Sequence, residues 1–364
     1  MKKGGKTKAA TAGSKRKAED VSGSSCSKSR PSTTSKSVDI APFLPLLPPL
    51  TTELKCDRNW LIDDINVSNE LMQIKSNCIN KHNKNEKMKP VEYLSFLTQA
   101  RHLKLVKSIE FEKFQVRLPS VIDTWLSELV NLCRDGEMRS LRVYLASLIS
   151  SEEAKTDDEL LLVASALSSL VPRYKTWEKD NAVEDTFVKN HFADVLDIIL
   201  GQDQDNILKY EWCNKKLSSC ILKPDYTLYF EDKEAKEVAT FIVEVKAPSR
   251  NKNSNDFIKL GFTLKSMLDS LIKRGMRSPR VLGLLVDGFD CYLYMMQIDN
   301  EAIYQMVELR RFSLPKSEEE LLLLRNLFEA TFLVKTVSLE VFKEFEGLTC
   351  GESDLLPLCR FAAE

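Results

Sequence analysis

Three charged residues stand at the ends of two apolar segments, in a pattern suited to chemistry on a substrate. Asp225 comes directly before residues 226–230, and residues 239–245 contain Glu244 and are followed by Lys246. Both segments are rich in β-branched and aromatic residues, which predicts two strands. Side chains two residues apart on a strand share a face, so Glu244 and Lys246 project together. A polar connection of hairpin length predicts antiparallel pairing, which brings Asp225 level with Glu244 and Lys246.

Two carboxylates and one amine at one place suit a hard cation and a phosphate substrate. Mg²⁺ takes oxygen ligands and keeps waters that a phosphate can replace. We expect Asp225 and Glu244 to bind Mg²⁺ or Mn²⁺, with the main-chain carbonyl of Val245 completing the ligand set. Lys246 would deprotonate or orient the attacking water. The alternative is a cross-strand ion pair on the surface of a sheet.

Position, and not the Glu-x-Lys spacing itself, singles out Glu244 and Lys246. The same triplet occurs at four other places, namely Glu53/Lys55, Glu153/Lys155, Glu231/Lys233 and Glu234/Lys236. Only Glu244 and Lys246 end a segment with the composition of a buried strand.

Pro224-Asp225 followed by Glu244-Val245-Lys246 resembles the signature of the PD-(D/E)XK nuclease superfamily. The resemblance covers about residues 180–310. It implies a restriction-endonuclease-like core of a helix, three strands, a helix and a strand. In that core the Asp, the Glu and the Lys bind Mg²⁺ and organise the hydrolytic water. The expected activity is metal-dependent hydrolysis of phosphodiester bonds in DNA, or in RNA.

The elements predicted around the motif follow the order of that core. They are a helix over 181–200, strands over 207–216, 226–230 and 239–245, a helix over 256–273 and a strand over 280–286. Two further strands, 291–298 and 303–309, are predicted to join through a turn at Asp299-Asn300. A last helix over 317–334 is predicted to begin with a capping box of Ser317 and Glu320. Agreement over several elements supports the assignment more than the short motif does.

The resemblance also suggests residues on the two flanking helices. The family often has an acid on its first helix that reaches the metal, and Glu184 is at that position. The alternative, given equal weight, is that this acid only complements the dipole of the helix whose N-terminus it is near. In the resembling fold the second helix borders the site, which gives Lys259 and Lys265 a role in contacting substrate phosphate; the alternative is a solvated helix face. His191, on the first helix, is expected to be a core residue instead of a base.

The chain as a whole is predicted to be an α/β protein with five regions. These are a disordered basic tail (1–38), a Pro-rich linker (39–51), a helical subdomain (52–178), the nuclease-like domain (179–312) and a C-terminal helix and tail (313–364). Within the helical subdomain, apolar residues at intervals of three and four predict helices over 91–108, 120–134, 137–150 and 157–170.

Charge is distributed unevenly along the chain. Residues 1–37 contain ten Lys or Arg and two acids, whereas residues 38–364 contain 42 basic and 51 acidic residues, a net charge of about −9. The acidic remainder argues against a broad basic surface for nucleic acid. Lys15, Arg16 and Lys17 resemble a nuclear-import signal and equally suit nonspecific phosphate binding. We therefore expect a nuclear protein, with the cytoplasm as the alternative.

Other chemistries find no support in the sequence. Nine cysteines show no Cys-x-x-Cys pair and the three histidines are scattered, so a zinc site is not expected and the thiols are expected to be reduced and mostly buried. No apolar segment follows the early lysines, which argues against a signal peptide. Residues 40–50 are too short and too rich in proline to span a membrane, and they suit an extended contact with a protein partner.

The preferred function is therefore a Mg²⁺-dependent nuclease acting through Asp225, Glu244 and Lys246, with nucleic acid, DNA above all, as its partner. The alternative is a catalytically inactive protein of the same fold that binds a nuclear protein or nucleic acid. A third interpretation, a helical scaffold with a chance motif, is disfavoured by the predicted order of strands.

Overall fold

The computed structural model describes residues 61–62, 65–84, 86, 111–177, 183–202, 205–212, 217, 222–248, 255–300, 303–348 and 353–359. The chain divides into two compact units, Met1–Lys36 and Ser37–Glu364, and every described residue belongs to the second. The predictions for the basic tail, the Pro-rich linker, the import signal at Lys15, Arg16 and Lys17, and the helix over 91–108 lie outside the described residues.

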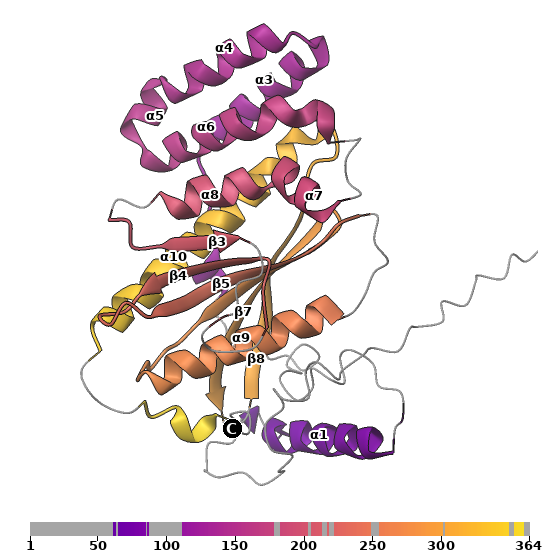
Figure 1. The fold of residues 1–364 in the computed structure, drawn as a ribbon, viewed down its shortest axis with the longest axis vertical. Coiled ribbons are helices and arrows are strands. Elements are labelled where there is room, and N and C mark those ends of the chain that lie inside the picture. Colours follow the sequence, from indigo (N-terminus) through magenta and orange to yellow (C-terminus); the bar gives the residue numbers. More distant parts are fainter. Residues whose placement is uncertain are drawn as a thin grey trace, which may run out of the picture. The chain divides into compact units, whose positions relative to one another are not determined.

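The protein is an α/β protein built on a mixed, open sheet of six strands (Figure 1). The strands lie side by side in chain order: β3 (Lys209–Trp212), β4 (Tyr226–Glu231), β5 (Glu237–Lys246), β6 (Val281–Asp287), β7 (Asp290–Asn300) and β8 (Ile303–Ser313). All neighbours pair antiparallel except β5 and β6, which are parallel. A parallel pair needs a crossover, and α9 (Asn255–Lys273) supplies it.

Helices cover both faces of this sheet. Figure 1 shows α9 against one face and α10 (Leu324–Glu346) against the other, and α9 packs on β5 and β6 while α10 packs on β5 and β8. The interior strands are therefore buried on both sides, which is why β5 reads as a nearly continuous apolar run. Its charged residues, Glu237, Glu244 and Lys246, fall near its two ends.

The other described elements precede the sheet or follow it. They are β1 (Leu61–Ile62), β2 (Ile65–Asn66), α1 (Val67–Asn83), η3 (Phe111–Phe114), α3 (Val121–Asp135), α4 (Met138–Ile149), α5 (Glu152–Thr156), α6 (Asp158–Leu170), η4 (Val171–Thr176), α7 (Glu184–His191), α8 (Ala193–Gly201), η5 (Glu318–Leu323) and η6 (Leu356–Leu358). The predicted helices over 120–134, 137–150 and 157–170 are confirmed. Gly136, with a φ of 71°, ends α3 in the left-handed conformation that glycine adopts readily.

Four details of the sequence prediction are wrong. The helix expected over 181–200 is two helices, because Phe192 leaves helical geometry with a φ of −156° and buries its ring beside Phe187 and Trp212. The strand expected over 207–216 begins later, at Lys209, and its described part ends at Trp212. The turn predicted at Asp299-Asn300 lies inside strand β7, where Asn300 pairs with Ile303.

The fourth error is the capping box at the start of the last helix. Ser317 makes no side-chain cap and instead donates its Oγ to Glu319 Oε2 at 2.7 Å. Glu320 Oε2 accepts from the main-chain N–H of Lys316 at 2.9 Å. The 3₁₀ helix η5 precedes α10 at this point. Because a 3₁₀ turn is tighter than an α-helical turn, Ser317 and Glu320 do not have the geometry of a capping box.

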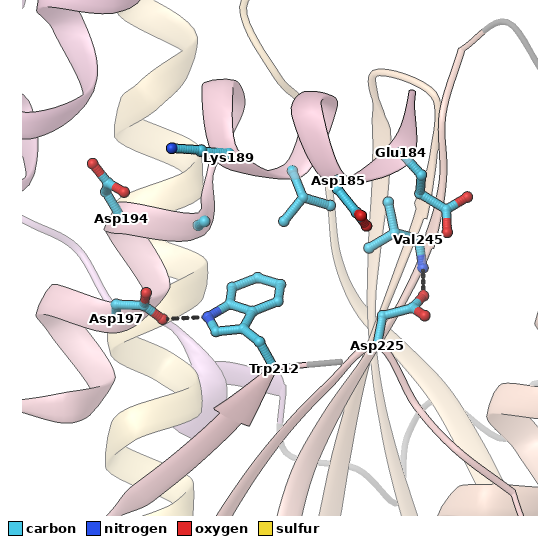
Figure 2. Close-up of a pocket in the computed structure, with 10 residues that line it drawn as sticks. Glu184, Asp185, Lys189, Asp194, Asp197, Trp212, Asp225 and Val245 are labelled. Carbon is cyan, nitrogen blue, oxygen red and sulfur yellow. Dashed lines mark hydrogen bonds between the residues drawn. The ribbon is translucent and has the colours of Figure 1, made fainter. Parts of the chain in front are cut away.

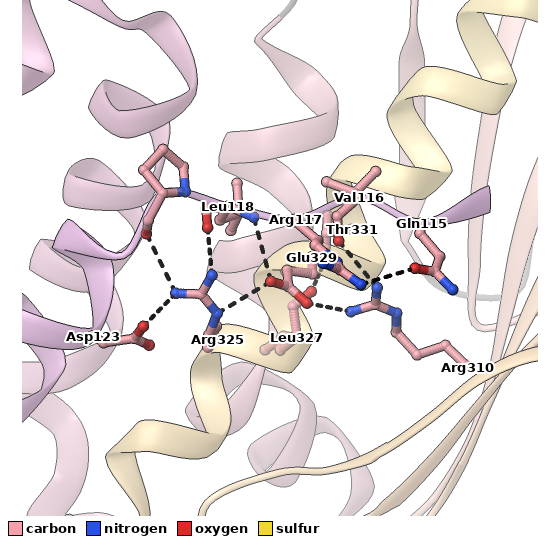
Figure 3. Close-up of polar contacts among 11 residues, drawn as sticks. Gln115, Val116, Arg117, Leu118, Asp123, Arg310, Arg325, Leu327, Glu329 and Thr331 are labelled. Atoms are coloured by element: carbon pink, nitrogen blue, oxygen red, sulfur yellow. Dashed lines mark hydrogen bonds and ion pairs between the residues drawn. The ribbon is translucent and has the colours of Figure 1, made fainter. Parts of the chain in front are cut away.

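An extended segment over residues 115–119 is attached to α10 and β8 by a network of charges (Figure 3). Glu329, on α10, lies 2.6 Å from Arg310 Nη1 and 3.1 Å from Arg325 Nε. Leu118 donates its main-chain N–H to Glu329 Oε1 at 3.3 Å. Both arginines also donate to carbonyl oxygens of the extended segment. The network therefore connects the strand region to the chain that enters α3.

His191 is a buried core residue, as expected. Its ring lies 4.8 Å from the ring of Phe187 and 5.3 Å from that of Phe289, and its Nδ1 is 3.2 Å from the carbonyl oxygen of Pro315. Burial lowers the pKa of His191 from 6.5 to about 4, against the opposing effect of the Pro315 carbonyl. The four cysteines described as free, Cys78, Cys133, Cys291 and Cys359, are also buried.

This depressed pKa predicts acid sensitivity. Between pH 4 and 6.5 the unfolded chain binds a proton at residue 191 that the folded chain does not, so stability falls as the pH is lowered through this range. We expect a loss of up to about 3 kcal/mol, at about 1.4 kcal/mol for each pKa unit. Denaturant unfolding at pH 4.5 and 7 measures it, and His191→Phe should show a smaller pH dependence. An unchanged pH dependence in His191→Phe would assign the acid sensitivity to other groups.

Candidate active site

The hairpin of β4 and β5 brings Asp225 beside the end of β5. Tyr226 pairs with Val243, and Asp225 donates its main-chain N–H to the Val243 carbonyl at 3.0 Å. The main-chain N–H of Val245 donates to Asp225 Oδ2 at 2.7 Å. Asp225 is therefore held level with Glu244 and Val245, in the antiparallel register expected from the sequence.

Glu244 is a buried carboxyl with only one of its oxygens hydrogen-bonded. Its side chain is 2% exposed, and Oε2 lies 2.6 Å from Nζ of Lys259, a residue of α9. The other oxygen, Oε1, has no hydrogen-bond partner. Burial raises the pKa of Glu244 from 4.5 to about 8; Lys259 opposes this, and Asp225 and Asp256 add to it. Such a carboxyl gains strongly from a further cation beside Oε1.

Lys246 is paired with an acid that sequence reasoning missed. Its Nζ lies 3.2 Å from Oδ2 of Asp256, and both side chains are largely buried, at 18% and 23% exposed. Asp256 is in the first turn of α9, directly after the loop that follows β5. An acid at the start of the helix after the Glu-x-Lys strand was visible in the sequence.

Together these residues form a charged cluster of three acids and two amines, namely Asp225, Glu244, Asp256, Lys246 and Lys259. Burial raises the pKa of Asp225, while its hydrogen bond from Val245 and the charge of Lys259 act in the opposite direction. Glu244 and Lys246 face α9, and Asp225 lies at the rim of the sheet between them and α7.

The donors fit a cation that is shared with a substrate better than one enclosed by protein. Among the described residues, no group of three or more His, Cys, Asp or Glu side chains is placed to hold a metal ion. Asp225 and Glu244 do offer hard oxygen ligands, and Glu244 Oε1 lacks a partner. Mg²⁺ is often held by one or two carboxylates, waters and substrate phosphate. The role expected for the Val245 carbonyl stays a prediction.

The two other residues suggested by the resemblance lie in different places. Glu184, at the start of α7, lines a cavity with Asp225 and Val245, and its role at the metal stays a prediction. Lys265 is buried on α9, where its Nζ lies 2.6 Å from Oδ2 of Asp269 and 4.5 Å above the ring of Tyr304. Lys259 is the lysine of α9 that reaches the charged cluster.

A cavity of about 340 Å³ opens beside Asp225, between α7, α8 and β3. Figure 2 shows the indole ring of Trp212 projecting into it from β3, under α7. Trp212 donates its Nε1–H to Asp197 Oδ1 at 2.7 Å. Burial raises the pKa of Asp197 from 3.8 to about 6, an effect that the Trp212 hydrogen bond opposes and Asp194 reinforces. Sequence reasoning missed this cavity, since Trp212 gave no sign of lying beside Asp225.

No family model matches the chain, and no curated protein or solved structure is similar enough to it to count as a match. Within the part of the chain that the structure describes, no helix has the length and apolar character needed to cross a membrane. The class that the fold defines is an α/β protein with a six-stranded mixed sheet and a charged cluster at the end of β5.

Proposed function

We propose that the protein is a metal-dependent nuclease that hydrolyses phosphodiester bonds of DNA, or of RNA, at Asp225, Glu244 and Lys246. The observation that carries this proposal is Glu244, a buried carboxyl with an unpartnered oxygen beside Asp225 at the end of β5. Burying an acid beside another acid lowers the stability of the folded state. Such an arrangement is therefore typical of a functional site. The order of helices and strands around it supports the same proposal.

Each residue has a distinct role in this proposal. Asp225 and Glu244 hold Mg²⁺ or Mn²⁺, which when bound supplies positive charge to the phosphate and lowers the pKa of water. Lys246 orients the attacking water, and Asp256, 3.2 Å from Nζ, fixes the direction of the Lys246 side chain. Lys259, whose Nζ lies 2.6 Å from Glu244, would offset negative charge on the substrate phosphate.

The net charge of the chain explains why a metal is needed in this proposal. Residues 38–364 carry about nine more acids than bases, so they repel a polyanion unless a local cation attracts it. The basic residues 1–37, including the import signal proposed at Lys15, Arg16 and Lys17, would supply nonspecific attraction and nuclear entry. Loss of nuclear accumulation on replacing these three residues by alanine tests the second part.

A second candidate is a catalytically inactive protein of this fold that binds a protein or nucleic acid. It is favoured by the ion pair of Lys259 with Glu244, which occupies one carboxylate oxygen. Among the described residues, moreover, no three or more His, Cys, Asp or Glu side chains are placed to hold a metal ion. Such a protein would show no Mg²⁺- or Mn²⁺-dependent rise in melting temperature, because neither ion would bind the folded chain.

Cleavage by the purified full chain distinguishes the two candidates. Single- and double-stranded DNA and RNA are incubated with Mg²⁺ or Mn²⁺, beside an EDTA control and the variant Asp225→Asn. We expect metal-dependent cutting that Asp225→Asn lowers at least about 100-fold, the size of effect that follows loss of one transition-state contact. Asp232→Asn, in the turn at the far end of the hairpin, is the matched control and should cut normally. Cutting that survives in Asp225→Asn would reject the assignment.

A further inference from the structure

The cavity between α7, α8 and β3 borders the proposed cleavage site, because Asp225 lines it. Trp212 pairs with Tyr226 across β3 and β4, and Tyr226 follows Asp225 directly. Neighbouring strands are about 5 Å apart, so the main chains of Trp212 and Asp225 are close. Asp225 and Val245 themselves line the cavity. A group that enters it is therefore adjacent to whatever Asp225 holds.

Trp212 presents an aromatic surface to this cavity. Its ring meets Tyr226 edge-on, with centroids 4.6 Å apart and planes at 65°, and its Nε1–H is taken by Asp197. These two contacts fix the ring while it remains only half-buried. Val188 and Ala193 add apolar atoms to the lining. At about 340 Å³, the space is at the small end of ligand pockets, which suits a single planar ring system.

Charge decides which part of a nucleotide the cavity accepts. Its lining includes five carboxyl groups, those of Glu184, Asp185, Asp194, Asp197 and Asp225, against one amine, that of Lys189. Such a lining repels phosphate but accepts hydrogen bonds from the N–H groups of a base. The phosphate belongs beside the charged cluster, and the base is the part that the cavity suits.

We propose that this cavity binds one unpaired nucleobase of the cleaved strand, stacked on Trp212, from the nucleotide beside the scissile phosphate. The inference rests on the proposed nuclease function and adds its substrate class. A base paired within a duplex is not free to enter, so single-stranded, frayed or mismatched sites are preferred over intact duplex. Stacking of a base on an aromatic side chain is worth about 1–3 kcal/mol, and the site would tolerate any base.

Cleavage of single-stranded oligonucleotides that carry one abasic position tests the placement. The abasic position is moved along the strand relative to the cut bond. We expect kcat/KM to fall roughly 5- to 100-fold only when it is the nucleotide beside the cut. Trp212→Ala should lose the same factor on the intact strand and nothing further on that abasic strand, while Trp212→Phe retains most activity. If Trp212→Ala and the abasic position instead each lower kcat/KM and their effects multiply, the base does not stack on Trp212. That result would overturn the inference without contradicting the nuclease function.

Direct binding of nucleosides keeps the inference testable if no cleavage is found. Saturation-transfer NMR with adenosine, guanosine, cytidine and uridine reports contact of the base without phosphate or metal. We expect the parent protein to give nucleoside signals. Ala193→Phe should remove them, because the larger side chain fills the cavity. This second variant keeps the test valid if Trp212→Ala does not fold. Nucleoside binding without any cleavage would reject the nuclease function and keep the cavity assignment. The absence of any nucleoside signal would overturn the cavity assignment. Binding of N-acetylarginine amide without binding of nucleosides would also overturn it, and would indicate that the cavity takes a cationic side chain of a protein partner.

Discussion

Glu244→Gln is expected to abolish metal-dependent cleavage and to make the folded protein more stable above pH 8. The activity should fall at least about 100- to 1000-fold, because the amide cannot supply the negative charge that holds the metal beside the phosphate. Glutamine has nearly the shape of a protonated glutamate and still accepts the hydrogen bond from Lys259. The loss would therefore be chemical and not structural.

The stability change follows from the raised pKa of Glu244. The folded chain keeps the proton up to about pH 8, whereas the unfolded chain loses it near pH 4.5. In this window the folded state binds more protons, so its stability falls as the pH rises. Glutamine carries no titrating proton and removes this fall. We expect a gain of roughly 1–4 kcal/mol at pH 9 and equal stability near pH 4.5, since each pKa unit corresponds to about 1.4 kcal/mol.

Urea unfolding of the two proteins at pH 5, 7 and 9 in EDTA measures the effect. Glu237→Gln, at the opposite end of the same strand, is the matched control for replacing a glutamate of β5 by glutamine. If Glu244→Gln is instead less stable at pH 9, the ion pair with Lys259 stabilises the fold. That outcome would favour the inactive binding protein over the nuclease.

The placement of Asp225 and Glu244 was predictable because it depends on local rules. The alternation of side chains along β5 and the short hairpin connection fix the register, so Asp225 reaches Val245 without help from distant parts of the chain. The order of strands and helices followed from the apolar periodicity in the same way. The partners of these residues on α9 were harder to predict.

Those partners depend on how α9 lies on the sheet, which no short-range pattern specifies. Lys259 and Lys265 are both on α9. Lys259 nevertheless reaches Glu244, whereas Lys265 is buried against Asp269. The break at Phe192 has the same origin, since it allows a ring to be buried between α7 and β3. The cavity beside Trp212 is lined by residues of both helices that this break separates.

Glu329→Ala is expected to cause the largest loss of stability among single substitutions at the charged residues of the network in Figure 3. The Glu329 carboxylate is the only acid in the described network that contacts both Arg310 and Arg325, and its side chain is 11% exposed. Its removal leaves the largely buried Arg310 beside the carbonyl oxygen of Val116 with no counter-charge in the network (Figure 3). Removing one partner of a buried ion pair typically costs about 3–5 kcal/mol.

Asp123→Ala is the matched control, because Asp123 contacts Arg325 at 2.8 Å but is 51% exposed. An exposed pair contributes about 0–1 kcal/mol, so this variant should unfold almost like the parent. Equal losses in the two variants would show that burial does not govern the strength of the network. Urea unfolding of both proteins at neutral pH gives the comparison directly.

Hydrogen exchange adds a local readout to the Glu329→Ala experiment. The main-chain N–H of Leu118 is buried and donates to Glu329 Oε1, and both arginines hold carbonyl oxygens of residues 116–119. Without the carboxylate, these contacts lose the group that orients both guanidinium groups. We expect exchange at the Leu118 amide to accelerate more than exchange at the amides of β5, because no residue of β5 belongs to this network of charges. Uniform acceleration across the sheet would instead mean that the segment and the sheet unfold as one cooperative unit.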